Sequence, residues 1–394
     1  MNNSNSYHKA LLLLACVSIP LPLFAALAPG GDAATSTDYT AKPPAVIESA
    51  DPLIIIDLSV ELTQQAEAYT DGNINYGSNA CPDRANDALN GAGPANNNTN
   101  IGVCYFDDYD YIGYFDPKKC YVYDTSGSNT GGQVAQSPYT GPGGGVYRGA
   151  SANPATSPDP HFFKPSSLAN ADHTCNGSNE WSGNYMNWAT MTAIDEFRGA
   201  MTGGARLIDT AGANAKTLLV NSFDRNWRFV RKAIVRGADK FSFGGTTFNT
   251  DIRQLTPFTG ANTRTVIAIN DAGSMDHRVR FLDRNGNVLE GKDFNVIVQV
   301  CDDSVSLEDN CVEYTDGTNT WYKPEGLLQK NALKMRYALS SYIAQNGNTR
   351  NGGVMRTLAK YIGFLQPADG GGLEVNTAGE IAEDGRIVFN PEGA

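Results

Sequence analysis

The sequence predicts an α/β fold in which a sheet with helices on both faces is interrupted by a loop-rich, disulfide-stapled insertion. The first observation is the apolar, β-branched run at 53–56, which ends at Asp57 and is typical of a strand buried on both faces. The second is the alternation of strand-like and helix-like patterns over 181–368. The third is the stretch 71–180, which is rich in Gly, Asn, Ser, Pro and Tyr and has almost no apolar periodicity.

Each element follows from a local pattern. Apolar residues at three- and four-residue steps run from Asn184 to the Gly203-Gly204 pair and predict a core helix. Asn285-Gly286 is a strong hairpin signal and predicts a turn within 280–294. The remaining predictions are helices over 227–235, 324–344 and 354–364, and strands over 265–269 and 295–300.

The N-terminus resembles an export signal. Lys9 precedes an apolar stretch, and small residues at Ala26 and Ala28 suit cleavage. The alternative is a lipoprotein box ending at Cys16, which only about four apolar residues precede, against the roughly 7 to 15 of a usual signal core. No later segment has the roughly 18 uninterrupted apolar residues of a membrane span.

These observations divide the chain into six parts. They are a signal peptide over 1–28, a linker over 29–50, the first strand and turn of the α/β domain over 51–70, the insertion over 71–180, the remainder of the α/β domain over 181–368, and a truncated tail over 369–394 that leads to a missing C-terminal domain.

The charge of the chain disfavours some partners. With 42 acidic and 30 basic residues, its formal net charge is -12. Phosphate backbones and anionic lipid surfaces are repelled by such a chain. The composition therefore argues against nucleic acid as a partner.

Six cysteines follow the signal segment, and an exported chain meets an oxidising compartment, so three disulfides are expected. Short loops close most easily, which favours Cys81 with Cys104, Cys120 with Cys175, and Cys301 with Cys311 among the alternatives. Zinc is disfavoured because the chain has no C-x-x-C pair and few histidines.

Two partial or complete D-x-S-x-S patterns are candidate metal sites, for which magnesium or calcium is the suitable ion. Asp57 and Ser59 follow the first strand, but Glu61 replaces the last serine. Asp124, Ser126 and Ser128 complete the pattern in a Ser/Gly-rich context without the expected helix. The competing interpretation is an aspartate that caps a turn in the first case and chance in the second.

The sequence predicts a protein without catalytic activity. It lacks the common hydrolase, nucleotide-binding and zinc-protease signatures. A secreted hydrolase remains an alternative if His161, His173 or His277 meets a serine and a carboxylate in space.

Aromatic residues in two stretches are candidates for a protein-contact surface, because tyrosine-rich faces bind proteins well. They are Tyr109, Tyr111, Tyr114, Phe115, Trp181 and Trp188. The alternative is that large rings beside disulfides form a small core.

Three stretches resemble the N-terminal region of PilY/PilC-type assembly and adhesion proteins of type IV pili. They are Y-I-G-Y-F-D-P-K-K-C-Y at 111–121, W-S-G-N-Y-M-N-W-A-T-M-T-A-I-D at 181–195, and K-P-E-G-L-L-Q at 323–329 with G-G-V-M-R at 352–356. The resemblance implies a von Willebrand A-like, Rossmann-type region and a place at the pilus tip, outer membrane surface or outside the cell. It implies roles in pilus assembly, adhesion and twitching motility, with minor pilins and host or abiotic surfaces as partners. Glu61 departs from the family's metal motif, and the C-terminal β-propeller of relatives is not in this sequence. An exported sugar- or matrix-binding module independent of pili is the alternative.

Overall fold

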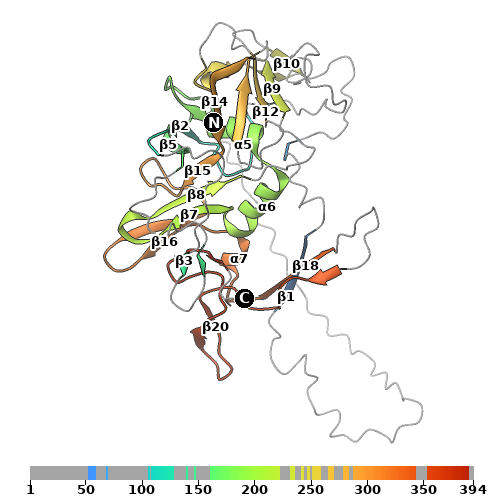
Figure 1. Cartoon of the computed structure of the whole chain (residues 1–394), viewed down its shortest axis with the longest axis vertical. Helices are drawn as coiled ribbons and strands as arrows, with labels where there is room; N and C mark the ends of the chain where they lie inside the picture. Colours follow the sequence, from blue (N-terminus) through green and yellow to red (C-terminus); the bar gives the residue numbers. More distant parts are fainter. Residues whose placement is uncertain are drawn as a thin grey trace, which may run out of the picture. The chain divides into compact units, whose positions relative to one another are not determined.

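The computed structural model describes part of the chain (Figure 1). The described residues are 52–58, 68–69, 105–106, 108–127, 139–140, 146–147, 160–221, 231–235, 241–243, 246–248, 251–258, 265–269, 278–283, 287–342 and 353–389. The expected signal peptide and linker lie outside them.

The largest sheet has six strands. In spatial order they are β6 (Trp181–Ser182), β2 (Lys119–Asp124), β5 (Phe162–Leu168), β15 (Ile297–Val300), β8 (Lys216–Val220) and β7 (Arg206–Thr210). β15 and β5 pair in parallel through Val298 and Phe163, and the other neighbours are antiparallel. Half of this sheet, namely β2, β5 and β6, is therefore built from the predicted insertion at 71–180 and the two residues that follow it.

A second sheet of four strands is antiparallel throughout. Its order is β14 (Val288–Asn295), β13 (Arg278–Leu282), β12 (Thr265–Ile269) and β9 (Arg231–Val235). β13 and β14 form the hairpin predicted over 280–294, and β12 and β15 confirm the strands predicted at 265–269 and 295–300. Alternating apolar residues and a two-residue turn signal suffice to specify such local pairing.

Smaller sheets complete the described strands. A parallel pair, β1 (Leu53–Leu58) and β18 (Arg336–Tyr342), is extended by β19 (Gly353–Met355), and β16 (Cys311–Thr315) pairs with β17 (Thr320–Pro324). The others are β10 (Phe241–Phe243) with β11 (Thr246–Phe248), β20 (Leu365–Pro367) with β21 (Leu373–Val375), and β22 (Val388–Phe389) with β4 (Val146–Tyr147) and β3 (Tyr139–Thr140).

Helices are few in the described part of the chain. The helix predicted from Asn184 is two helices, α5 (Gly183–Thr190) and α6 (Ala193–Thr202), because the backbone is extended at Met191 and Thr192. Ser182 caps α5, and Thr192 forms a capping box with Asp195 at the start of α6. α7 (Leu327–Lys330) is a single turn, and short 3-10 turns lie at η2 (Gly212–Asn214) and η3 (Ile252–Gln254).

The predicted fold class is wrong. The structure consists mainly of antiparallel strands, not of a Rossmann-type or von Willebrand A-like sheet with helices on both faces and an insertion looped out of it. The helix predicted over 324–344 is instead the end of β17, the short α7 and the strand β18, and 354–364 contains the end of β19. Of the helix predicted over 227–235, the described residues form β9, and the rest lies outside the described part.

The first strand also differs from its prediction. β1 is a strand, but Leu53 and Ile55 are 47% and 53% exposed, so it is not buried on both faces. It lies at the edge of a three-stranded sheet, where only β18 pairs with it among the described strands. A continuous apolar run identifies a strand but does not establish that two layers cover it.

The main core is aromatic. It lies against α5 and receives side chains from both large sheets. Its largest fully buried members are Trp181, Trp188, Tyr105, Tyr111, Tyr121, Tyr185, Phe115, Phe163 and Phe281. Trp181 packs against Phe258, Phe281 and Phe294 with ring centroids 4.9 to 5.1 Å apart, which joins the two sheets through one side chain.

Candidate functional site

Residues 110–118, here called the strap, cross α5 and are held there by two buried asparagines. Asn184 accepts the Tyr111 N–H at 2.7 Å and donates to the Tyr109 carbonyl at 2.9 Å. Asn187 accepts the Phe115 N–H at 3.0 Å and donates to the carbonyls of Tyr111 and Phe115, each at 2.7 Å. A buried irregular segment needs such partners, so the side chains of α5 replace the sheet ladder that the strap lacks.

Gly113 is required by this close approach. A Cβ atom at this position would lie 2.2 Å from Oδ1 of Asn187. No side chain fits there without moving the helix or the strap.

The predicted aromatic contact surface is mostly core. Tyr111, Tyr114, Phe115, Trp181 and Trp188 are all buried, whereas Tyr109 is 52% exposed. The alternative interpretation of the rings is therefore correct for these five, because burial removes them from any partner's reach. The side chains that are exposed near the strap belong to residues other than these five.

The buried hydroxyl of Tyr114 in the strap has two hydrogen-bond partners. Tyr114 donates to Asp195 at 3.2 Å and accepts the Ala205 N–H at 3.1 Å. Burial, with the Asp195 carboxylate second, raises the pKa of Tyr114 well above its ordinary value. Tyr114 therefore stays a neutral donor that ties the strap to both ends of α6.

The segment that faces the strap is the disulfide loop, residues 301–311, which the Cys301–Cys311 bond closes. Glu308 accepts the Cys301 N–H at 2.8 Å and pairs with the Nζ atom of Lys119 at 2.8 Å. Lys119 is fully buried, and it also donates to the Ser306 carbonyl at 2.6 Å. The buried ammonium thus fixes the loop against the start of β2.

A groove of about 540 Å³ lies between the strap and the disulfide loop. Parts of α6, β5, β8, β15 and β17 complete its lining, including Glu196 and Leu168. Its volume lies within the range of roughly 300 to 1,000 Å³ for ligand pockets. This groove is the candidate functional site of the described residues.

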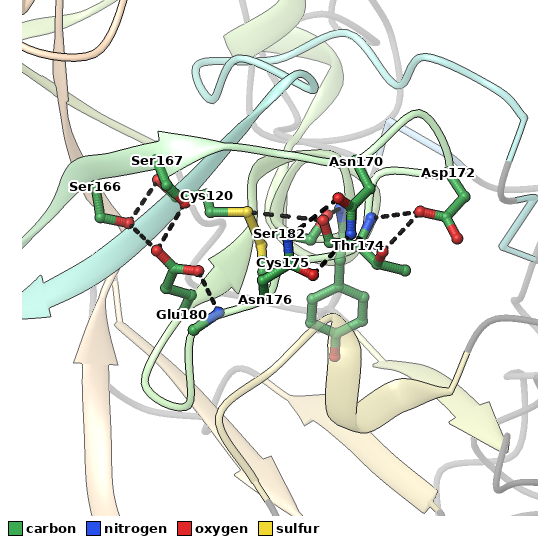
Figure 2. The surroundings of a disulfide bond; sticks show 12 residues. Cys120, Ser166, Ser167, Asn170, Asp172, Thr174, Cys175, Asn176, Glu180 and Ser182 are labelled. Atoms are coloured by element: carbon green, nitrogen blue, oxygen red, sulfur yellow. Dashed lines mark hydrogen bonds between the residues drawn. A yellow bond between two sulfur atoms is a disulfide. The ribbon is translucent and has the colours of Figure 1, made fainter.

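The second disulfide anchors the strand that follows the strap. Cys120 of β2 is bonded to Cys175, and Figure 2 shows polar side chains on both sides of the bond. Glu180 accepts hydrogen bonds from Ser166 and Ser167 of β5 on one side, and Asn170 donates to Thr174 on the other. The pairings expected for Cys120–Cys175 and Cys301–Cys311 are both present, and Cys81 and Cys104 lie outside the described residues.

Only part of each predicted metal motif lies within the described residues. Asp57 accepts a hydrogen bond from Ser340 at 3.0 Å, and Ser59 lies outside the described residues. Asp124 accepts the Ser126 N–H at 2.8 Å, and hydrogen bonds from Ser126 hold the pKa of Asp124 below its ordinary value. Ser128 lies outside the described residues, so the geometry seen for Asp124 is that of an aspartate capping its own turn.

Two other groups gather potential metal ligands in the described chain. They are Cys120 and Cys175 with Glu180, and Cys301 and Cys311 with Glu308. In both, the sulfur atoms form disulfides, so they offer no thiolate to a metal.

Two of the three candidate histidines, His161 and His173, lie within the described residues. The His173 ring is 2.7 Å from Asp110, and Nε2 of His161 is 3.2 Å from the Gly127 carbonyl. His277 lies outside the described residues.

A buried charge network supports the opposite edge of the main sheet. Asp209 of β7 contacts Arg206 at 2.7 Å and Lys323 at 2.6 Å, and all three side chains are buried. Asp209 also accepts the Ile387 N–H at 3.1 Å, while Arg206 donates to the Gly385 carbonyl. The network therefore attaches β17 and residues 385–387 to β7.

Sequence reasoning missed Lys119 and the two asparagines. Lysine in a strand gives no sign of burial, because it is usually exposed. Asn184 and Asn187, however, lie one helical turn apart among apolar residues, and amides on an apolar helix face indicate a buried backbone segment opposite them.

Known proteins match this chain in part. Residues 155–288, which run from β5 through β13, match the family described as PilY1 homolog, small alpha/beta domain. The chain is 31% identical over 275 residues to the type IV pilus biogenesis factor PilY1 homolog of Xylella fastidiosa, an alignment that covers 67% of this chain and 20% of the relative. The chain thus spans about one fifth of that relative's length. No solved structure matches. Within the described residues, no helix has the length and apolarity to cross a membrane.

Proposed function

Because the chain belongs to the PilY1-type proteins, we propose that it functions in type IV pilus biogenesis as an exported factor that acts through protein contacts and not through catalysis. The observation that carries the proposal is the 31% identity to a pilus biogenesis factor over 67% of this chain. Export is supported by the disulfides Cys120–Cys175 and Cys301–Cys311, because such bonds persist in oxidising compartments.

The finer parts of the proposal are its place and partners. We propose that the protein acts at the pilus tip or the cell surface, where it contacts minor pilins and promotes adhesion to host or abiotic surfaces. The groove beside the strap supports a role in binding, since it is a preformed depression on an otherwise ordered core.

A gene deletion tests the proposal. Surface pili and twitching are scored in the deletion strain, in a strain that also cannot retract pili, and in a strain complemented with the full gene. We expect loss of surface pili in the single deletion and their return when retraction is blocked or the gene is restored. Unchanged piliation and twitching would contradict the proposal and favour an exported binding module that is independent of pili.

A further inference from the structure

We propose that the groove between the strap and the disulfide loop binds an apolar peptide segment that carries a basic side chain and belongs to a partner protein. The inference deepens the proposed function, on which it rests, by assigning a chemistry to the partner. Three features of the groove support it: exposed apolar side chains, an excess of carboxylates, and walls that are fixed in advance.

The apolar part of the lining is exposed to solvent. Ile112 of the strap is 66% exposed, Leu168 of β5 is 59% exposed, and Leu307 of the disulfide loop is 36% exposed. The three side chains come from three separate segments that meet at one depression. Exposed apolar groups gathered in this way indicate an interaction site more strongly than single surface residues do.

The charged part of the lining is acidic. Among the described residues of the lining, the carboxylates are Asp110, Asp116, Glu196, Glu308 and Asp309, and the one cationic side chain is Lys118. Some of this charge is compensated, because Lys119 contacts both Asp116 and Glu308. Asp110 also lies 2.7 Å from the His173 ring. Asp309 is exposed and has no ion-pair partner among the described residues. A segment with a basic side chain beside its apolar residues complements both properties of the groove.

The walls are fixed before any partner arrives. Asn184 and Asn187 hold the strap, while the Cys301–Cys311 bond and the buried Lys119 hold the disulfide loop. A preorganised site loses less conformational entropy on binding than a flexible one. The groove can therefore bind a short segment without first refolding.

Fluorescence anisotropy with synthetic peptides tests the inference on the purified, oxidised chain. The probes are short peptides that place Leu, Ile or Phe around one Lys, with matched panels in which Gln or Glu replaces the Lys. The test variants are Ile112→Ser and Asp309→Lys. Their matched controls are Leu358→Ser, at a highly exposed leucine outside the groove, and Asp303→Lys, which makes the same charge change elsewhere in the disulfide loop.

We expect members of the Lys panel to bind, and their Glu counterparts to bind more weakly. Asp309→Lys should weaken the Lys peptides by about three- to tenfold, since it replaces one exposed attraction by a repulsion. Ile112→Ser should also weaken them, whereas both control variants bind as the natural chain does.

Absence of binding by every peptide, or equal binding of the Lys and Glu panels, would overturn the inference. Equal losses in the test variants and their controls would overturn it as well. If deletion of the gene still abolishes surface pili, such a binding result rejects only the groove inference. If the deletion leaves surface pili unchanged, the proposed function itself is rejected.

Discussion

Replacement of Asp209 by Asn should strongly destabilise the folded chain. The carboxylate is the anionic centre of a buried network, with Arg206 at 2.7 Å and Lys323 at 2.6 Å. Asparagine has nearly the same shape but no charge, so the variant leaves two buried cations together without their counterion. It also turns an amide donor toward groups that are themselves donors.

The magnitude follows from this geometry. Removing one partner of a buried ion pair costs about 3 to 5 kcal/mol, because the remaining charge is uncompensated. The control Asp384→Asn makes the same chemical change in the partly exposed pair with Arg386, where about 0 to 1 kcal/mol is expected. A domain has only about 5 to 15 kcal/mol of stability, so the first change removes a large part of it.

Urea unfolding of the oxidised full chain at neutral pH, followed by tryptophan fluorescence, measures both variants. A loss below about 1 kcal/mol for Asp209→Asn, or a loss equal to that of the control, would refute the assignment of Asp209 as the counterion of both cations. Amide hydrogen exchange of Ile387, whose N–H donates to Asp209, is measured in parallel to detect unfolding limited to residues 385–387.

The dependence on pH gives a second signature. Burial favours a higher pKa for Asp209, but Arg206 and Lys323 outweigh it and hold the pKa below its ordinary value. A carboxyl group with a lowered folded pKa contributes stability above its unfolded pKa, and loses it as the pH falls through the folded value. The stability difference between the natural chain and Asp209→Asn should therefore be constant near neutrality and narrow below about pH 4.

Three further predictions concern other buried and exposed groups. Glu308→Gln should cost about 3 kcal/mol in urea unfolding, because Lys119 stays buried with its main partner removed, and adding Lys119→Met should recover most of the loss. A double variant that is as unstable as the sum of the two single changes would argue against this pairing. Asn187→Leu should cost at least about 3 kcal/mol, since three strap hydrogen bonds disappear, and a smaller loss would mean that water replaces them. Ile55→Ala should cost less than about 1 kcal/mol and Ile297→Ala about 2 to 5 kcal/mol, and equal costs would contradict the exposure of β1.

Local signals predicted local structure well. The turn signal at Asn285-Gly286 predicted the β13–β14 hairpin, and the strands predicted at 265–269 and 295–300 correspond to β12 and β15. The pairing of Cys301 with Cys311 followed from a loop of 10 residues, which closes at little entropic cost. Each of these features depends on residues close together in the chain.

Long-range pairing overrode the helical pattern near the C-terminus. Leu327 and Leu333 were expected on the apolar face of this helix, but they are 55% and 43% exposed, so this part of the expected face is not buried. Residues 336–341 instead pair with β1, 283 positions away, and β1 supplies hydrogen bonds in place of those that a helix would have made internally. No pattern within the segment reveals that partner, which is why the fold class was predicted wrongly.

Three of the stretches that resemble pilus proteins, at 111–121, 181–195 and 323–329, are joined through α5 and α6, whereas Gly353–Met355 form the strand β19 of another sheet. The strap and α5 are joined by Asn184 and Asn187, while Gln329 donates to the Thr202 carbonyl at the end of α6 at 2.8 Å. At Gly203 a Cβ atom would lie 2.3 Å from the Pro324 carbonyl, so this end of α6 accepts only glycine against β17. Most residues that carry the resemblance in these three stretches therefore assemble the core, and substitutions of these residues should first impair folding. Ile112 differs from the other residues of its stretch, because it is 66% exposed beside the groove and is therefore the side chain for which we propose a contact with a partner.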